Sequence, residues 1–407
     1  MNKVKCQFFI LCFVVISVGT SFADEGNLLN KSDNNKTSFL EGPAINSWAK
    51  FISSGDIIMP QPRPNNSEHQ EIKGQEDKAL GTLSEEGILE AKQELELEPE
   101  PDVTMAIRAD TIEPVFIDGD IDESIELPEY PEDAIKMIGE NKTYTVREED
   151  TLLDIARHFD LGFIETFVAN PNIDTWIPEI GTEITLPHFK IVPRTKAQEG
   201  IVVNLAQMRI YYFKDKDSEP LTFPIGIGRE GLQTPVGQTR IAWKRENPTW
   251  SPTKRMLEEK EWLPKVVPSG VNNPLGTHAL YLGWSTFLMH GTNKPWAIGR
   301  RVSSGCMRMY PKDIKQLFDM VEWNTPVTIV NQPILVAEKD GDLYLEANPT
   351  VTQGNDIEMK AMFKPKPLND EVKNVISKAF GDLAKEVKWD KVAKIMLERR
   401  GYPIKIN

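Results

Sequence analysis

The sequence predicts a multidomain α+β protein. A β-rich, sandwich-like domain follows a small β-α-α-β module and precedes a helical extension, and three observations support this order. The charge changes abruptly near residue 140, short strand-forming stretches between Gly and Pro follow residue 200, and amphipathic helical stripes return after residue 370. Many short strands between breakers favour a sandwich or barrel-like sheet over a doubly wound one.

The amino terminus has the pattern of a cleaved secretory signal peptide. Lys3 and Lys5 precede an apolar run over residues 8–18, and the small residues of Ser21-Phe22-Ala23 suit signal peptidase. We therefore expect residues 1–23 to be removed. The alternative, a membrane anchor, is disfavoured because a helix needs about 20 apolar residues to span a bilayer.

Removal of the signal peptide leaves a single cysteine. Cys6 and Cys12 leave with that peptide, so Cys306 has no disulfide partner in its own chain. An unpaired thiol in an oxidising compartment is a liability unless it is buried or chemically needed. Cys306 is therefore a candidate reactive residue.

Charge divides the mature chain into unlike parts. Residues 24–140 carry 28 acidic and 9 basic residues, net −19, whereas residues 141–407 carry 33 acidic and 36 basic residues, net +3. The first segment buries too little apolar surface to offset the cost of ordering the chain, so we expect a largely disordered tether. An acidic docking segment for a basic envelope partner is the functional alternative. The sequence has no basic stripe or motif typical of nucleic-acid binding.

Residues 141–190 predict a compact module. Apolar residues recur at strand spacing at its two ends and at helical spacing between them. The tripeptide Asn-Pro-Asn follows the second predicted helix. This pattern resembles a LysM domain, and the resemblance implies binding to the N-acetylglucosamine-containing glycan of peptidoglycan. The predicted elements are a strand at 144–146, a helix at 152–159 capped by Asp150-Thr151, a helix at 163–169 and a strand at 184–187.

Residues 198–331 predict the β-rich domain. One helix, over 311–321, follows Cys306 closely, so the thiol is expected near a helix start. The strands are predicted at 201–205, 208–213, 221–227, 238–243, 279–283, 287–290 and 327–330.

The last part, residues 332–407, predicts a helical extension. Apolar positions share one face at 372–383 and again at 389–396, and residues 342–346 favour one strand. We expect the helices to pack as a structural cap beside the β-rich domain. Gating of a substrate site is the functional alternative.

A histidine and the cysteine have the chemistry of a base and a nucleophile. His290 ends an apolar run at 287–289, which would hold it at a strand terminus, and an imidazole can lower a thiol pKa and relay its proton. The Gly291 carbonyl can fix the imidazole tautomer in place of a carboxylate. Gly305 permits a sharp turn whose backbone N–H groups can stabilise an oxyanion. Arg308 adds a planar donor for a substrate carboxylate.

Each of these residues also has an ordinary structural interpretation. A lone cysteine is most often a small buried hydrophobe, His290 could be a core histidine, and Gly305 could serve only a turn. Their combination is what favours catalysis. One thiolate without paired His or Cys spacing falls short of a zinc site, so no metal is expected. The other histidines are expected to be structural or exposed: His69, His158, His188 and His278.

The segment Ser303-Ser304-Gly305-Cys306-Met307-Arg308 resembles the catalytic signature of the L,D-transpeptidases, cysteine enzymes that exchange bonds in bacterial cell-wall peptides. The resemblance covers roughly residues 200–331. Ser304 departs from the histidine that many members carry there, so the role of that second histidine is not expected here. Further landmarks are Thr234-Pro235-Val236-Gly237, Asn247-Pro248-Thr249-Trp250-Ser251-Pro252, Val267-Pro268-Ser269-Gly270 and Asn273-Pro274-Leu275-Gly276.

The resemblance assigns roles to the site residues. Cys306 would be the nucleophile, His290 the base, and Gly291 would orient the imidazole through its carbonyl. The remaining residues would form the oxyanion hole and bind substrate: Asn293, Ser303, Ser304, Gly305 and Arg308, the last through a substrate carboxylate.

The resemblance also implies an activity without a cofactor. Cys306 would attack the carbonyl between residues three and four of a stem tetrapeptide and expel D-alanine. An amine, from diaminopimelate of another stem or from a lysine of an envelope lipoprotein or outer-membrane protein, would accept the acyl group. Two alternatives stay open: an L,D-carboxypeptidase with water as acceptor, and a vestigial peptidoglycan-binding scaffold. Papain-like wall hydrolases are disfavoured because they place Cys before His. The expected location is periplasmic and cell-wall associated.

Overall fold

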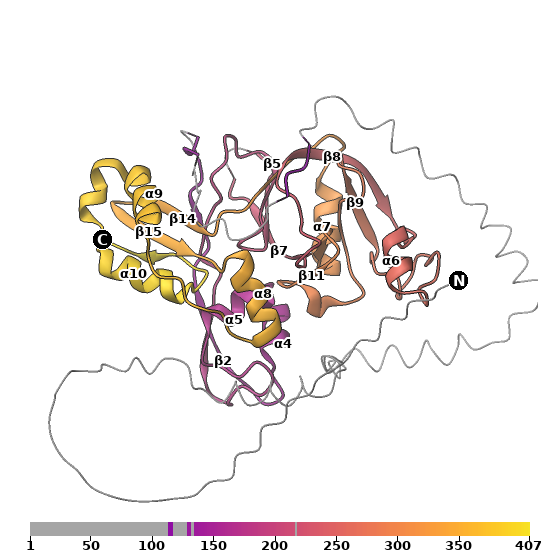
Figure 1. Cartoon of the computed structure of the whole chain (residues 1–407), viewed down its shortest axis with the longest axis horizontal. Coiled ribbons are helices and arrows are strands. Elements are labelled where there is room, and N and C mark those ends of the chain that lie inside the picture. Colours follow the sequence, from indigo (N-terminus) through magenta and orange to yellow (C-terminus); the bar gives the residue numbers. More distant parts are fainter. Residues whose placement is uncertain (1–112, 117–127, 132–133, 216–217) are drawn as a thin grey trace, which may run out of the picture. The chain divides into compact units, whose positions relative to one another are not determined.

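The computed structural model describes residues 113–116, 128–131, 134–215 and 218–407 (Figure 1). The predicted signal peptide, 1–23, and most of the acidic segment lie outside these residues. Among the helices of the described part, none is long and apolar enough to cross a membrane.

Nine strands of the described chain form one sheet, as the prediction of a β-rich domain requires. They are β5 (Gly200–Asn204), β6 (Arg209–Phe213), β7 (Leu221–Gly228), β8 (Gly237–Glu246), β9 (His278–Leu282), β10 (Leu288–His290), β11 (Arg301–Ser303), β12 (Met307–Met309) and β13 (Pro326–Val330). Their order is β11-β7-β12-β10-β9-β8-β13-β5-β6, and β7 also pairs with β6. The β6–β7 pairing joins the strand at one end of this order to the strand next to the other end, so the predicted sandwich is largely closed, and β11 is left at the end of the sheet.

The two faces of β10 and β12 have different surroundings. Met289, Met307 and Met309 are fully buried and share the main hydrophobic core with helix α7 (Pro311–Met320). Because side chains alternate along a strand, Leu288 and Cys306 lie on the opposite face, where both belong to a smaller cluster. Cys306 therefore precedes a strand rather than the helix that the sequence suggested, since β12 is inserted between β10 and β7.

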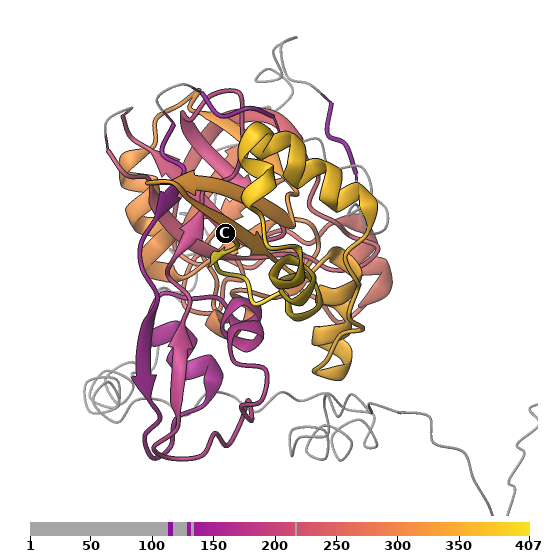
Figure 2. The same ribbon diagram turned by 90° about the vertical axis from the view of Figure 1, so that its left-hand side faces the viewer.

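The module before the sheet contains the four predicted elements in the predicted order: β2 (Lys142–Thr145), α4 (Leu152–His158), α5 (Phe163–Ala169) and β3 (Glu183–Leu186). Strands β2 and β3 pair antiparallel and run side by side in purple and magenta in Figure 2. Thr151 caps α4 by accepting the Asp154 N–H at 3.1 Å. Asp150 instead accepts the Tyr144 hydroxyl at 2.8 Å, and so holds β2 to the helix entrance.

The module packs directly against the sheet domain. The backbone N–H groups of Phe163 and Ile164 donate to the carbonyls of Ile298 and Gly299, at 3.2 and 3.0 Å. A β carbon on Gly162 would come 2.6 Å from the Gly299 Cα, so only glycine permits this approach. Two short strands, β1 (Met137–Ile138) and β4 (Lys190–Ile191), pair on either side of the module.

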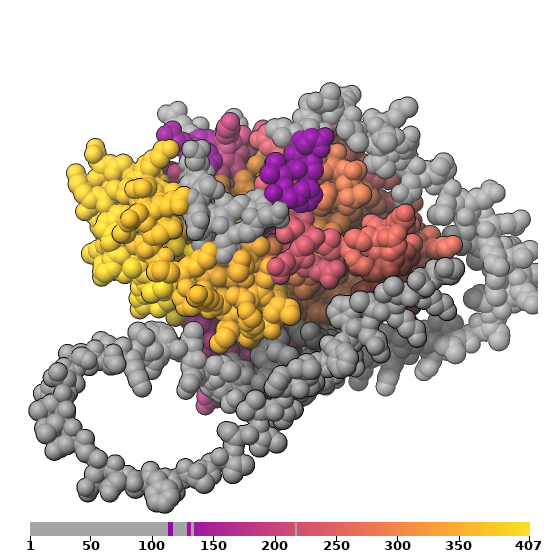
Figure 3. All heavy atoms as spheres, viewed as in Figure 1, coloured from indigo at the N-terminus to yellow at the C-terminus, as the bar shows by residue number. Residues whose placement is uncertain are grey.

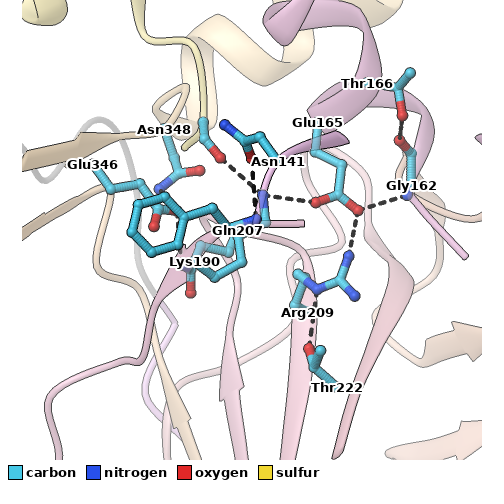
Figure 4. Close-up of polar contacts among 12 residues, drawn as sticks. Asn141, Gly162, Glu165, Thr166, Lys190, Gln207, Arg209, Thr222, Glu346 and Asn348 are labelled. Atoms are coloured by element: carbon cyan, nitrogen blue, oxygen red, sulfur yellow. Dashed lines mark hydrogen bonds and ion pairs between the residues drawn. The ribbon is translucent and has the colours of Figure 1, made fainter. Parts of the chain in front are cut away.

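A buried ionic cluster connects the module, β4 and β6 (Figure 4). The Glu165 carboxylate lies 2.6 Å from an Arg209 guanidinium nitrogen and 2.9 Å from Lys190 Nζ, and it accepts the Gly162 N–H at 2.6 Å. Burial alone raises the pKa of Glu165, but Arg209 and Lys190 outweigh it and hold that pKa below its usual value. Lys190 also donates to the Gly401 carbonyl at 2.8 Å, so the cluster reaches the carboxyl terminus.

The carboxyl-terminal part combines helices with a small sheet. Two of the helices coincide with the amphipathic patterns predicted at residues 372–383 and 389–396. The sheet contains a hairpin whose turn, Asp340-Gly341, has positive φ at both residues, 55° and 82°, as a tight two-residue hairpin requires. The elements are β14 (Ile334–Lys339), β15 (Asp342–Ala347), α8 (Val351–Lys360), α9 (Asp370–Phe380), η3 (Gly381–Glu386), α10 (Trp389–Glu398) and β16 (Ile404–Lys405).

Helix α8 contacts the strand that leads to the cysteine. Glu358 forms a buried ion pair with Arg300 and accepts the Arg301 backbone N–H at 3.1 Å. The Arg301 guanidinium donates to Asn355 at 3.0 Å. Gly354 faces the aliphatic part of Arg301, where a β carbon would come within 2.9 Å. The start of β11 is therefore held by residues more than fifty positions later in the chain.

Candidate active site

His290 is buried at the end of β10, with 4% of its surface exposed. Its Nδ1 lies 2.5 Å from the Gly291 carbonyl oxygen. A carbonyl can only accept, so Nδ1 carries the proton and Nε2 is the nitrogen that can take one up. Burial lowers the pKa of His290 to about 3 and Arg308 adds to this, while the carbonyls of Gly291 and Leu275 oppose it. The imidazole is therefore neutral at rest.

Cys306 follows a tight turn between β11 and β12. Gly305 has φ +107°, and a β carbon there would come 2.9 Å from the Phe287 ring, so the position requires glycine. The Ser303 hydroxyl donates to the Cys306 carbonyl at 2.6 Å and accepts the Gly305 N–H at 3.2 Å. Ser303 thus braces the turn from both sides of the glycine.

Thr234 supports the same turn from another segment. Its hydroxyl donates to the Gly305 carbonyl at 2.8 Å and accepts the Gly228 N–H at 3.0 Å, and its side chain is buried. Sequence reasoning gave this residue no role, although it lies in one of the recognised landmarks.

The Cys306 thiol is partly exposed and donates to the Thr286 carbonyl at 3.5 Å. The pKa of Cys306 is raised because the sulfur is buried. The Leu288 backbone N–H and the Arg308 guanidinium each lower that pKa, but burial has the larger effect. The thiol is therefore protonated at neutral pH and needs a base to become a nucleophile.

Strand register brings the base, the thiol and a cation to one face. β10 and β12 are parallel, with Met289 opposite Met307 and His290 opposite Arg308. Arg308 lies in β12 and Cys306 lies just before that strand, two residues away, so alternation puts both side chains on the side of the sheet that His290 faces. From the strand rise and spacing, the Cα atoms of Cys306 and His290 are about 8 Å apart. Two side chains can bridge that separation.

Arg308 carries the cation of the site. Its side chain is half-buried, and its Nε is buried without a hydrogen-bond partner within the described chain. Burial lowers the pKa of Arg308, while Cys306 opposes that shift. A buried donor without a partner costs free energy until a ligand satisfies it, and a carboxylate matches a guanidinium best.

Asn273 organises the loop that covers His290. This fully buried residue donates to the carbonyls of Pro248 and Pro268, at 2.7 and 3.0 Å, and accepts the Leu275 N–H at 2.8 Å. It therefore ties three landmarks together and places the Leu275 carbonyl against the imidazole. Sequence reasoning gave this residue no role, although it begins one of the recognised landmarks, because only contacts between distant segments reveal that role. The loop also contains helix α6 (Lys254–Glu259).

The other predicted site residues have varied positions. The Asn293 amide donates to the Asn272 carbonyl at 3.0 Å, so it fastens the covering loop. Ser304 is half-buried in the turn beside Gly305. A short helix, η2 (Pro295–Ala297), follows Asn293.

The side chains of two other histidines contact groups outside this site, although the His278 carbonyl accepts the Gly291 N–H at 3.1 Å. His278 packs against Phe318, ring to ring at 4.8 Å, and contacts Thr277. His158 contacts Phe159 in the module, and His69 lies outside the described residues. Across the described ranges, His, Cys, Asp and Glu form no group of three or more positioned to hold a metal ion.

Comparison with known proteins identifies relatives over about two thirds of the chain. The family described as the L,D-transpeptidase catalytic domain matches residues 198–329. The Escherichia coli (strain K12) protein named "Probable L,D-transpeptidase YbiS" is 37% identical over 286 residues, covering 68% of this chain and 90% of its own. "Probable L,D-transpeptidase ErfK/SrfK" of the same strain is 35% identical, with coverage of 68% and 89%. Among solved structures, an L,D-transpeptidase from Mycobacterium smegmatis matches 37% of this chain and 64% of its own, with 21% identity and a TM-score of 0.26.

Proposed function

The chain belongs to the L,D-transpeptidase family, and we propose that Cys306 is the nucleophile with which it acts on peptidoglycan stem peptides. The observation that carries this assignment is the common face of Cys306, His290 and Arg308 on paired strands. A neutral imidazole with Nδ1–H bound to a carbonyl presents Nε2 as a base. Its position on the same face as the sole mature cysteine is the arrangement that thioester chemistry needs.

The acylation step follows from these groups. Nε2 of His290 takes the thiol proton as Sγ of Cys306 attacks the carbonyl carbon between the third and fourth stem residues. The Sγ–C bond forms and the C–N bond breaks, and the imidazolium returns its proton to the leaving amine of D-alanine. A thioester remains on Cys306, and an incoming amine then reverses the sequence and releases the cysteine.

Two backbone amides beside the nucleophile are the best candidates for the oxyanion hole. The Gly305 N–H donates to Ser303 in this structure, which leaves the amides of Ser304 and Cys306 nearest the attacked carbonyl. Backbone donors preorganised at the nucleophile stabilise the tetrahedral intermediate without moving. Ser303, by holding the turn, has a positioning role.

Arg308 links substrate binding to activation of the base. Its charge lowers the pKa of His290, so a bound substrate carboxylate would offset that charge and make the imidazole more basic. The same carboxylate would satisfy the buried Nε. Binding and proton transfer are thereby coupled through one residue.

The module from β2 to β3 is the candidate wall anchor, as its resemblance to LysM implies. Ile177 and Ile180, in the loop before β3, are 83% and 65% exposed, and exposed apolar side chains often mark a binding surface. A double Ile177→Ser, Ile180→Ser variant should bind insoluble peptidoglycan more weakly while retaining exchange of soluble stem peptides. A module of this kind suits a periplasmic, wall-associated enzyme.

The acceptor is tested by product analysis. Purified mature protein would be incubated with tetrapeptide-rich sacculi, and the muropeptides analysed by mass spectrometry. We expect cross-links between two stems, formed with loss of D-alanine. Shortened stems without cross-links would assign water as acceptor, and a stem joined to a lysine would assign an envelope protein. Unchanged muropeptides would contradict the proposed activity.

A further inference from the structure

A short piece of the acidic segment is docked beside the catalytic turn. This piece comprises residues 113–116. The Val115 N–H donates to the Val236 carbonyl at 3.0 Å, and the Val236 N–H donates back to the Val115 carbonyl at 2.8 Å. In Figure 3 the piece is the indigo group at the upper middle of the surface.

An aromatic contact extends the docking toward the nucleophile. The rings of Phe116 and Phe287 lie 6.2 Å apart at 48°, within the range of favourable ring pairs. The Phe287 ring occupies the space that a β carbon on Gly305 would need. The residue before Phe287 is Thr286, whose carbonyl accepts the Cys306 thiol.

The backbone contact leads to the same turn. Val236 follows Thr234 by two residues, and Thr234 holds the Gly305 carbonyl. The Gln233 carbonyl lies 3.4 Å from the position of a Gly305 β carbon. Residues 113–116 therefore touch, at Val236 and Phe287, the two segments that pack around the turn before Cys306.

The docking is suited to exchange with another chain. Val115 and Phe116 are 55% and 52% exposed, and one reciprocal pair of backbone bonds joins an extended piece to Val236. An extended peptide can bind to an exposed strand through the same main-chain hydrogen bonds, and the pockets that its side chains occupy then determine specificity. The stem peptide that Cys306 attacks is such a chain.

We propose that residues 113–116 form a strap that competes with the peptide substrate for Val236 and Phe287, and so limits acylation of Cys306. This inference rests on the proposed function of Cys306. It assigns residues 113–116 of the acidic segment an autoinhibitory role that operates on large substrates. A small reagent that needs neither Val236 nor Phe287 should reach the thiol whether or not the strap is docked.

Release of the strap is the first test. Val115→Pro removes the donated N–H, and Phe116→Ala removes the ring. Both variants of the full mature chain should be acylated several-fold faster by a soluble stem tetrapeptide, through a lower KM. Phe116→Tyr and Leu397→Ala, the latter at an exposed site on α10, should behave as wild type. Iodoacetamide should alkylate Cys306 at one rate in all of them.

Locking the strap is the second test. In a double Val115→Cys, Val236→Cys variant, oxidation should join the bridge partners, and acylation by the tetrapeptide should slow until a reductant restores it. Single Val115→Cys is the matched control, and peptide mapping verifies which thiols are joined. Release variants that are acylated no faster than wild type, or a locked variant as fast as its reduced form, would overturn the proposal.

A tetrapeptide–maleimide conjugate separates the strap from the enzymatic function. This probe labels Cys306 without any transpeptidase chemistry, yet it is as large as the substrate. If the tetrapeptide fails to acylate wild type, the proposed function fails. The strap is then still tested by maleimide labelling of Cys306, which should be faster in the release variants and slower in the locked variant.

Discussion

His290 and Arg308 lie opposite each other on the neighbouring parallel strands β10 and β12. The guanidinium of Arg308 lowers the pKa of His290 and also lowers that of Cys306. Burial is the larger cause of the low His290 pKa and raises the pKa of Cys306, so Arg308 reinforces the neutral base and partly offsets the effect of burial on the thiol. This relationship makes Arg308 more than a contact for substrate, and it leads to the first prediction.

Replacing Arg308 should move the titration of the nucleophile. Arg308→Met removes a charge that lowers the Cys306 pKa, so the midpoint of the pH–alkylation profile should move to higher pH. The KM for a stem tetrapeptide should rise as well. Arg308→Lys should keep the midpoint near wild type while losing part of the binding, because an ammonium lacks the planar fork. An unmoved midpoint in the Met variant would contradict the electrostatic role.

Replacing Cys306 should abolish the chemistry and leave the fold. Cys306→Ala removes the only thiol that can form a thioester, so no turnover of tetrapeptide is expected. Intact-mass measurement should find a covalent carbapenem adduct on wild type and none on the variant, as resemblance to the family implies. Thermal unfolding serves as the control. An adduct on the variant would remove Cys306 from the mechanism.

Replacing His290 should slow proton transfer. A general base typically contributes about 10² to 10⁴ in rate, so His290→Ala should lose turnover by about that factor. Cys306 alkylation at neutral pH should also slow. We would measure both rates across pH 5 to 9, with His278→Ala as the matched control at a histidine outside the site. If the two variants share one alkylation profile, His290 is not the base.

Asp313 should make stability fall as pH rises. Burial raises its pKa from 3.8 to about 7, with Asp160 adding to this and Lys312 opposing it. The folded state therefore binds the proton more tightly, so its contribution is complete below pH 3.8 and is lost as pH rises toward 7. A rise of about three pKa units corresponds to roughly 4 kcal/mol.

Asp313→Asn removes that titration, so urea unfolding should find the variant more stable than wild type by a few kcal/mol at pH 8. The gain should be smaller at pH 5, where the folded carboxyl is already protonated. An equal difference at both values would show that Asp313 does not titrate in this range.

Glu165 should be essential to the union of module and sheet domain. Glu165→Ala would leave Arg209 and Lys190 buried without their carboxylate, and breaking a buried pair in this way costs about 3–5 kcal/mol. Urea unfolding is the measurement, and Glu148→Ala, at an exposed acid of the same module, should change stability by no more than about 0.5 kcal/mol. If Glu165→Ala left the free energy of unfolding unchanged, the module would fold independently of the sheet.

Residue chemistry and local pattern were sufficient for much of this protein. The thiol, the histidine and the arginine could be selected from one short stretch, because nucleophile, base and cation are properties of residue type and spacing. Most elements of the module and of the β-rich domain could be placed to within a few residues, because alternation and helical spacing are local. The three-residue strands β11 and β12, on either side of the catalytic turn, were not predicted. The missed hairpin at Asp340-Gly341 also had a local signature.

Only the tertiary structure decided which distant segments meet. Thr234 holds the Gly305 carbonyl from 71 residues away, and Asn273 joins three loops that share no sequence pattern. Lys190 of β4 and Gly401 are 211 residues apart, yet their contact closes the buried cluster around Glu165. Such pairings follow from burial and from the need to satisfy every buried polar group, conditions that are met only once the whole chain has folded.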